Sequence, residues 1–201
     1  VNSYFAPYCY NPSYFAPAQM RLFKDYLKKY SSLLSGTPYA NRVAEFSAVL
    51  DGTIDTGYQL MYQTQCTNGA VPNWVTLSSS SSAKPWEGLN FACSASGTAA
   101  RTFGADASRA PWRVCLDYLW YPNDSSITTS DGKTYGAKQF CNKFAKAIMD
   151  QMKSTNCVTS GSMSSCKPVA NALSNNLNGC NSPYGVSVQN TDDVQYNGFM
   201  Y

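Results

Sequence analysis

Apolar residues recur at intervals of three and four along several stretches of the chain, which is the spacing of a helix face buried against other elements. The stretches cover about 17–34, 41–62, 108–121, 135–153 and, more briefly, 168–177. Residues 63–104 show no such period and are rich in Ser, Gly and Asn, and 181–201 are predicted to be loop with at most a short strand. The pattern predicts an all-α domain whose helices are joined by long polar loops.

Each of the four long stretches has one apolar stripe that we expect to be buried. In 17–34 the stripe consists of Met20, Phe23, Leu27 and Tyr30. In 41–62 it consists of Val43, Phe46, Leu50, Ile54, Tyr58 and Met61. In 108–121 it consists of Trp112, Cys115, Leu116, Leu119 and Trp120. In 135–153 it consists of Phe140, Phe144, Ile148 and Met152.

A carboxylate and a guanidinium stand where the third long helix is expected to begin. Asp106 and Arg109 lie three residues apart. Ser108 or Asp106 can accept hydrogen bonds from the first-turn N–H groups, and Pro111 fits that turn because its missing N–H costs nothing there. These residues are typical of an N-capping aspartate with an exposed arginine, and they also suit a carboxylate held rigidly for chemistry.

Two longer motifs decide between these readings. Residues 11–18 read Asn-Pro-Ser-Tyr-Phe-Ala-Pro-Ala, and 106–120 follow the pattern D-A-x-R-x-x-W-R, then D-Y-x-W. Between them, 71–74 read Val-Pro-Asn-Trp. In sequence, order and rough spacing these segments resemble glycoside hydrolase family 8, the inverting β-glycanases that include endoglucanases, chitosanases and some xylanases. The resemblance is close from residue 11 to about 120, with a looser match at 174–176.

The resemblance implies that 1–201 form a single domain equivalent to the C-terminal half to two-thirds of a family 8 catalytic domain. Its fold would be part of an (α/α)6 toroid, and its substrate a β-linked polysaccharide cleaved without a cofactor. The family's base maps onto Asp106, the tyrosine that helps hold the attacking water onto Tyr14, and a sugar-contacting arginine onto Arg109. The aromatic side chains expected to stack on sugar rings are Trp74, Trp86 and Trp112.

The family's general acid has no counterpart in these residues. It is a glutamate in an S-E-G-x-G-Y segment, and the chain holds only Glu45 and Glu87. Ala105 and Asn73 also replace a tyrosine and an aspartate of the family pattern. We therefore expect the N-terminal part that carries the acid to be absent and the chain alone not to hydrolyse a glycan.

Two functions consequently remain open. The chain is either a piece of a secreted, endoglucanase-like β-glycan hydrolase or a non-catalytic extracellular protein with a structural or glycan-binding role. Part of a toroid would leave helix faces uncovered. A missing N-terminal segment or self-assembly would then have to cover them.

Composition excludes several other functions. Asp, Glu, Lys and Arg make up 13% of the chain and the net charge is +3, too sparse and scattered for a nucleic-acid surface. No apolar run approaches the roughly 20 residues of a membrane span. The sequence contains no histidine, which removes Ser-His-Asp and Cys-His mechanisms. With no Cys-x-x-Cys pair either, a Cys/His metal site is poorly supported.

Eight cysteines, an even number, favour disulfides and a secreted, oxidising location. Cys157 and Cys166 close a short Ser/Gly-rich loop and are the pair we expect first, while the other pairings stay open. Cys115 is the least certain, because it falls on an expected buried stripe where a free thiol would also fit. Asn123 opens an Asn-Asp-Ser acceptor pattern just after the third helix and is a candidate glycosylation site.

Overall fold

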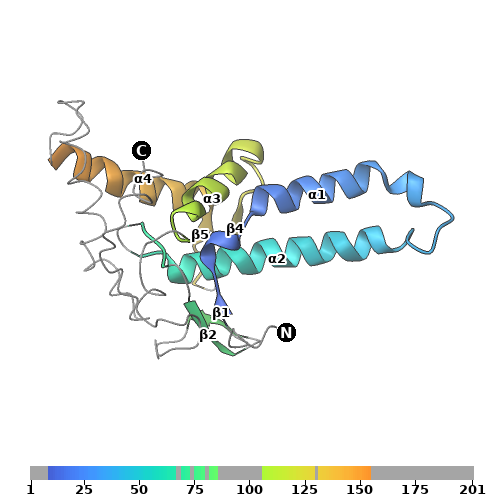
Figure 1. Ribbon diagram of the computed structural model, residues 1–201, viewed down its shortest axis with the longest axis horizontal. Helices are drawn as coiled ribbons and strands as arrows, with labels where there is room; N and C mark the ends of the chain where they lie inside the picture. Colours follow the sequence, from blue (N-terminus) through green and yellow to red (C-terminus); the bar gives the residue numbers. More distant parts are fainter. Residues whose placement is uncertain are drawn as a thin grey trace.

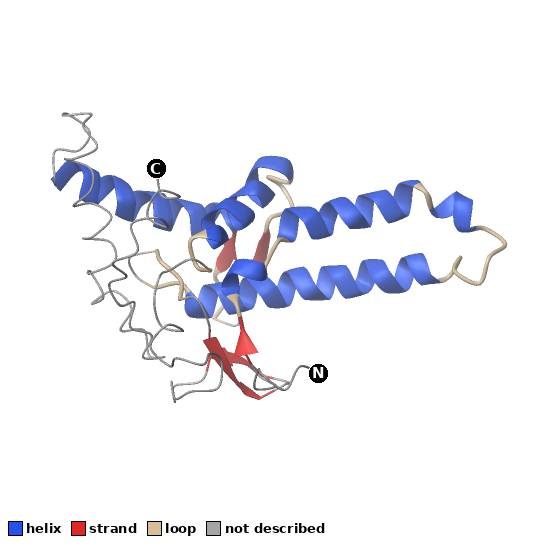
Figure 2. Ribbon diagram, in the orientation of Figure 1, coloured by secondary structure: helices blue, strands red, loops and turns tan. Residues whose placement is uncertain are grey.

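The computed structural model describes residues 9–66, 69–72, 75–79, 82–85, 106–129 and 131–154, and helices dominate them (Figure 2). The helices are α1 (Pro17–Lys29), α2 (Arg42–Thr64), α3 (Arg109–Trp120) and α4 (Ala137–Ser154), with short 3-10 turns η1 (Pro12–Tyr14) and η2 (Ser31–Leu34). The four long helices predicted from the apolar period are thus confirmed to within a few residues. The fifth, 168–177, and the loop over 181–201 lie outside the described residues.

Two small antiparallel sheets accompany the helices. One contains β1 (Cys9–Tyr10), β2 (Val75–Ser79) and β3 (Ser82–Pro85), and the other contains β4 (Ser126–Thr128) and β5 (Thr134–Gly136). The described chain is therefore mostly helical rather than all-α, and β2 and β3 fall in the segment predicted to be loop. Strands of two to five residues are too short to give a readable period.

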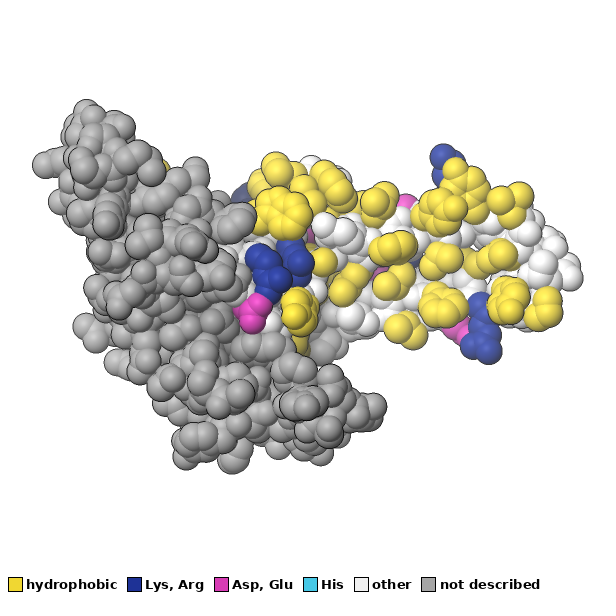
Figure 3. Space-filling model, in the orientation of Figure 1, with side chains coloured by type: hydrophobic (Ala, Val, Ile, Leu, Met, Phe, Trp, Pro, Cys, Tyr) yellow, Lys and Arg dark blue, Asp and Glu magenta, His cyan; other side chains and the backbone are white. Residues whose placement is uncertain are grey.

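Helices α1 and α2 run antiparallel, connected through η2, and form an arm that projects from the rest of the described chain (Figure 1). An ion pair between Lys24 and Asp51, 2.6 Å apart, links the two helices. Apolar side chains spread over the visible face of this arm (Figure 3), and Phe23 and Phe46 are each more than half exposed. The prediction that both are buried is wrong, because along most of the arm each helix packs only against the other.

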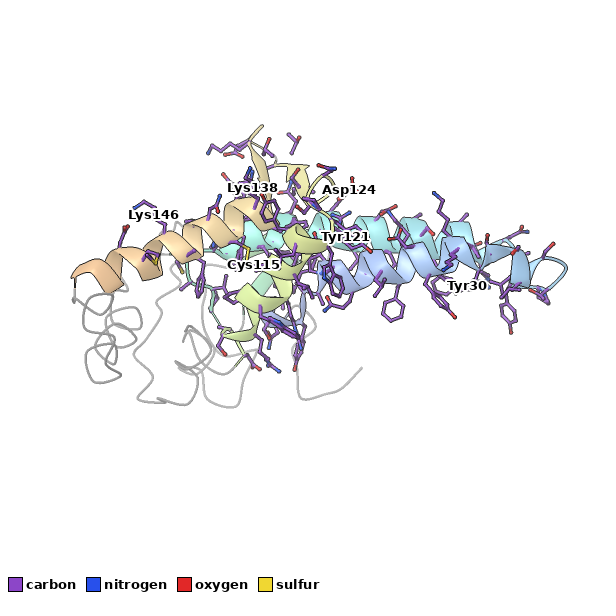
Figure 4. The ribbon with its side chains drawn as sticks, turned by 90° about the horizontal axis from the view of Figure 1, so that it is seen from above. Tyr30, Cys115, Tyr121, Asp124, Lys138 and Lys146 are labelled. Carbon is purple, nitrogen blue, oxygen red and sulfur yellow. A yellow bond between two sulfur atoms is a disulfide. The ribbon has the colours of Figure 1, made fainter. Side chains whose placement is uncertain are left out.

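Helix α3 packs on α4, and a disulfide joins them. The two cysteines are Cys115 on α3, which is labelled in Figure 4, and Cys141 on α4. Their Cα atoms lie 5.8 Å apart. Cys66, just after α2, is also disulfide-bonded. The prediction of disulfides is confirmed for these three residues, including the least certain, whereas Cys157 and Cys166 lie outside the described residues.

The core lies where the base of the arm meets α3 and α4. Its largest fully buried apolar side chains are Ile54, Tyr58, Met61, Val71, Val114 and Phe140. Phe15, just before α1, packs edge-on against Tyr58 with ring centroids 5.0 Å apart. Gly57 makes room for this contact, because a Cβ at that position would overlap the Phe15 ring. Burying a side chain of this size contributes roughly 1.5–3 kcal/mol to the stability of the fold. The contact of Phe15 with Tyr58 therefore holds the preceding turn, η1, against α2.

Helix α3 buries a different face from the predicted one. Ala110, Val114 and Asp117 are buried. The large side chains of the predicted stripe are mostly exposed, namely Trp112 (64%), Leu119 (73%) and Trp120 (50%). The buried face of α3 carries the small side chains of Ala110 and Val114, which let the helix approach α1 and η1. It also carries the carboxylate of Asp117, which pairs with a buried arginine of α1. The prediction of a buried stripe is therefore wrong for the three exposed residues.

That carboxylate belongs to a buried polar network that ties three helices together. Arg21 of α1 donates through Nε to both carboxylate oxygens of Asp117 on α3, at 3.0 and 3.3 Å. The hydroxyl of Tyr58 on α2 donates to the same carboxylate, and Arg21 Nη2 donates to the backbone carbonyl of Asp124. Burial raises the pKa of Asp117, against the lowering effects of Tyr58 and Arg21. Burial likewise raises the pKa of Tyr58.

The described helices make two packed pairs, α1 with α2 and α3 with α4, and do not by themselves close into a ring. Within the same part of the chain, no helix combines the length and the apolar character that crossing a membrane requires.

Candidate functional site

The turn before α1 presents Tyr14 to solvent while anchoring its neighbours. Asn11 caps η1, its Oδ1 accepting a hydrogen bond of 2.9 Å from the Ser13 N–H. Pro12 fits the first position of the turn because it needs no N–H there. Pro12 and Ser13 are buried, Phe15 enters the core, and Tyr14 between them is 59% exposed. The Asn-Pro-Ser-Tyr-Phe sequence thus forms a turn whose buried residues hold the exposed side chain of Tyr14 in place.

The start of α3 holds the predicted carboxylate and guanidinium together. A turn closed by the Arg109 N–H on the Asp106 carbonyl leads into the helix. The Arg109 guanidinium also forms an ion pair with the Asp106 carboxylate. Ser108 occupies the N-cap position without a side-chain capping hydrogen bond. The carboxylate of Asp106 is therefore held by Arg109, and both side chains are partly exposed.

Two arginines on α3 join these segments across more than ninety residues of sequence. The Arg109 guanidinium carbon lies 5.6 Å from the centroid of the Tyr14 ring, a cation–π contact. Arg113, one helical turn further on, donates to the backbone carbonyl of Ser13. Arg109 thus contacts both Asp106 and Tyr14, the two residues that the sequence placed at one site.

Several buried polar atoms around this turn have no hydrogen-bond partner. They are Tyr10 Oη, Asn11 Nδ2, Ser13 Oγ and Arg109 Nε, four of the seven such atoms among the described residues. Burial raises the pKa of Tyr10. Unpaired buried polar atoms are rare in folded proteins, so their concentration at one place is typical of a site that binds water or a ligand.

The other predicted site residues are placed unevenly. Trp112 lies three residues after Arg109 on α3, and its exposed ring is available for stacking. Asn123 is exposed in the turn after α3, as a glycan acceptor requires. Trp74 and Trp86 lie outside the described residues.

Sequence reasoning missed two features that hold the site. One is the contact from Arg113 to the Ser13 carbonyl, since Arg113 belongs to the D-A-x-R-x-x-W-R motif but the motif did not indicate this partner. The other is the pairing of Arg21 with Asp117, which has no local signal because 96 residues separate them.

Two other carboxylates of the described residues, those of Glu45 and Asp117, are each engaged in an ion pair of their own. Glu45 is exposed on the arm and pairs with Arg42 at 3.2 Å. Asp117 is fully buried and already bound to Arg21. Glu87 lies outside the described residues. No group of three or more His, Cys, Asp or Glu side chains in this part of the chain is arranged to hold a metal ion.

Comparison with known proteins gives one match. Over 143 residues the chain is 29% identical to Endoglucanase A of Acetivibrio thermocellus, a similarity that covers 70% of this chain and 23% of that protein. The chain thus spans about a quarter of the length of the curated relative it matches. No family model and no solved structure matches the chain.

Proposed function

We propose that this chain carries the base side of a β-glucan hydrolase site of the inverting, family 8 type, with Asp106 as the base. The observation that carries the proposal is the single arginine, Arg109, that contacts both Asp106 and Tyr14. The similarity to an endoglucanase supports the substrate class. In this proposal the two packed helix pairs are part of an (α/α)6 toroid.

Inverting hydrolysis needs a base that activates water and an acid that protonates the leaving oxygen, with carboxyl groups roughly 6.5–9.5 Å apart. Asp106 takes the proton from the attacking water, and the Tyr14 hydroxyl helps to hold that water. Arg109 holds the Asp106 carboxylate and the Tyr14 ring in a fixed position relative to each other, and it also contacts the sugar. Trp112, exposed on the same helix, stacks on a sugar ring.

In this proposal the general acid comes from outside the described residues, since Glu45 pairs with Arg42 on the arm and Asp117 is buried against Arg21. We propose that a further polypeptide segment supplies it, in a secreted protein with a disulfide between Cys157 and Cys166 and a glycan at Asn123. A second function uses the same site without cleavage: glycan binding by a structural protein. The engagement of Glu45 with Arg42 and of Asp117 with Arg21 favours this alternative for the chain taken alone.

Binding to cellohexaose tests the proposal in the 201-residue chain itself. We expect calorimetry to detect binding, a loss of affinity in Trp112→Ala, and little change in Asp106→Asn, since the base acts on water. Absence of binding to cellohexaose by the unaltered chain would refute the proposed function.

Hydrolysis distinguishes the two functions. We expect no reducing ends from cellulose, chitosan or xylan with the chain alone. In any longer form that cleaves β-glucan, Asp106→Asn should lower turnover by about 10²–10⁴, and the first product should be the α-anomer by proton NMR. Asp51→Asn, on an exposed arm aspartate, is the control. Asp106-dependent cleavage by the 201-residue chain would instead make Glu87 the leading acid.

A further inference from the structure

The arm formed by α1 and α2 leaves many large apolar side chains uncovered. Among the described residues thirteen such side chains are exposed, and eight of them lie between Leu22 and Val49. Monomeric soluble proteins seldom expose a contiguous apolar surface of more than a few hundred Å², and larger surfaces mark interaction sites. The arm therefore has the composition of an interface.

One face of the arm carries apolar side chains from both helices. At the base of this face lies a cavity of about 660 Å³, whose lining includes Met20 of α1 and Val49 and Gly52 of α2. Residues three or four positions further along each helix continue the same face toward the tip. We call this surface the arm groove, and its residues are Met20, Phe23 and Tyr26 of α1 and Phe46, Val49 and Gly52 of α2.

Phe23 and Gly52 lie at one level of the arm. The ion pair between Lys24 and Asp51, 2.6 Å apart, fixes the register of the two antiparallel helices (Figure 1), and Phe23 and Gly52 each lie one residue from it toward the base. The Phe23 side chain is more than half exposed. Gly52 lies inside a continuous helix, where alanine is more favourable, and a Cβ there would meet no atom within 4 Å. At this level the groove thus combines a projecting ring on α1 with open space on α2.

We propose that a second copy of the chain packs on the arm groove about a two-fold axis that runs along the arm. Such an axis keeps every residue at its level and places α1 of one copy against α2 of the other. The Phe23 ring of each copy then lies over Gly52 of the other, where the space is open. The two arms together form a four-helix bundle with apolar side chains turned inward. The inference goes beyond the proposed function, because it concerns none of the proposed catalytic residues.

The charges beside the groove favour a second copy as the partner. Counted from the Lys24–Asp51 pair, Lys29 of α1 lies within one residue of the level of Glu45 on α2, and both are exposed. The two-fold axis therefore brings Lys29 of each copy near Glu45 of the other, so that the same pair of opposite charges forms twice. Glu45 accepts from Arg42 through Oε2, which leaves Oε1 for this contact.

The area of the groove agrees with a dimer interface. Phe23, Tyr26, Phe46 and Val49 are each more than half exposed. Since a fully covered aromatic side chain buries about 150–250 Å², these residues supply on the order of 400 Å² on each copy. That is about half of the roughly 800 Å² per partner of a standard interface. The cavity wall and the polar edges of the groove lie beside these residues and supply further area.

Gly52→Leu tests the packing. In a single copy the new side chain enters open space and favours the helix, so we expect an unchanged circular dichroism spectrum. In the dimer it takes the space of the Phe23 ring of the second copy. Sedimentation equilibrium of the disulfide-intact 201-residue chain should give twice the mass of the chain at about 100 μM, since interfaces of this size have a Kd in the micromolar range or below. We expect Gly52→Leu to raise the Kd at least about tenfold. Ala44→Leu, on an exposed α2 residue outside the cavity lining, is the matched control and should dimerise as the unaltered chain does.

Exchange of charges tests the two-fold axis itself. Lys29→Glu and Glu45→Lys each place like charges together at both contacts, so each variant alone should dimerise more weakly, by up to about tenfold. An equimolar mixture of the two variants pairs opposite charges again at both contacts and should recover the dimer. No recovery in the mixture, or equal weakening by Gly52→Leu and Ala44→Leu, would overturn the inference. An unaltered chain that is monomeric at about 100 μM would also overturn it and would leave the arm groove to another polypeptide.

Discussion

Arg21 supplies the cation for the one fully buried carboxylate of the described chain, so replacing it by methionine removes the charge while keeping an apolar side chain of similar reach. Asp117 is fully buried, and the Arg21 side chain is only 11% exposed. Removing one partner of a buried ion pair costs about 3–5 kcal/mol, because the other charge remains unpaired inside the protein. A domain of this size is stable by about 5–15 kcal/mol. We therefore expect Arg21→Met to remove a large part of the free energy of unfolding at pH 7.

The pH dependence of that loss identifies its cause. Burial already raises the pKa of Asp117, and Arg21 opposes the rise. Without Arg21 the folded-state pKa rises further above the unfolded value of 3.8, so the folded state binds the proton more tightly than the unfolded state does. Destabilisation by the ionised Asp117 is therefore fully present above the raised folded-state pKa and is relieved as the pH falls from there toward 3.8. The cost of Arg21→Met should shrink steadily between pH 7 and pH 4.

Urea unfolding of the disulfide-intact chain, followed by circular dichroism at several pH values, measures both effects. Lys24→Met is the matched control, because Lys24 lies one turn away on α1 and forms an exposed ion pair with Asp51. An exposed pair of this kind contributes only about 0.2–1 kcal/mol. The reasoning is refuted if Arg21→Met costs no more than Lys24→Met, or if its cost does not change with pH.

Two further predictions concern the packing around the site. Replacing Cys115 and Cys141 together by alanine should lower the free energy of unfolding by about 2–4 kcal/mol in denaturant titrations, since the disulfide closes a long loop between α3 and α4; a loss below 1 kcal/mol would count against it. Gly57→Ala should destabilise by about 1–3 kcal/mol because its Cβ overlaps the Phe15 ring, whereas Gly52→Ala should stabilise by up to about 1 kcal/mol. Equal effects of the two alanines would contradict the assigned Phe15 contact.

The helices were predictable because their apolar residues repeat over many turns, and the buried half of α2 followed the prediction. Ile54, Tyr58 and Met61 are all buried as expected. Phe46, on the same predicted stripe, is exposed because it lies on the arm beyond the reach of α3 and α4. Periodicity thus identifies the element and its apolar side, while burial depends on how far the neighbouring elements extend.

The orientation of α3 could not be read from its sequence. Its apolar stripe pointed to Trp112 and Leu119, yet the fully buried side is another one, which carries Asp117 together with Ala110 and Val114. A carboxylate in a helix is normally taken as a surface residue, because burying it is costly unless a cation is present. The cation is Arg21, which lies 96 residues earlier and has no local signal that connects it with Asp117. The ion pair between Arg21 and Asp117, which are distant in sequence, therefore helps to determine which face of α3 is buried.

The two segments of the candidate site were predicted from their motifs, and the structure brings Arg109 of one against Tyr14 of the other. The motifs did not indicate which contacts hold the start of α3 against the turn before α1. Arg113 binds the backbone of the turn at Ser13, and Arg109, four residues earlier, is then free to pair with Asp106 and contact Tyr14. Because both arginines lie on one side of α3, a small rotation of the helix would disturb the turn and the carboxylate together. The buried pair of Arg21 and Asp117, which fixes that rotation two turns further along α3, thus acts on the geometry of the site without touching it.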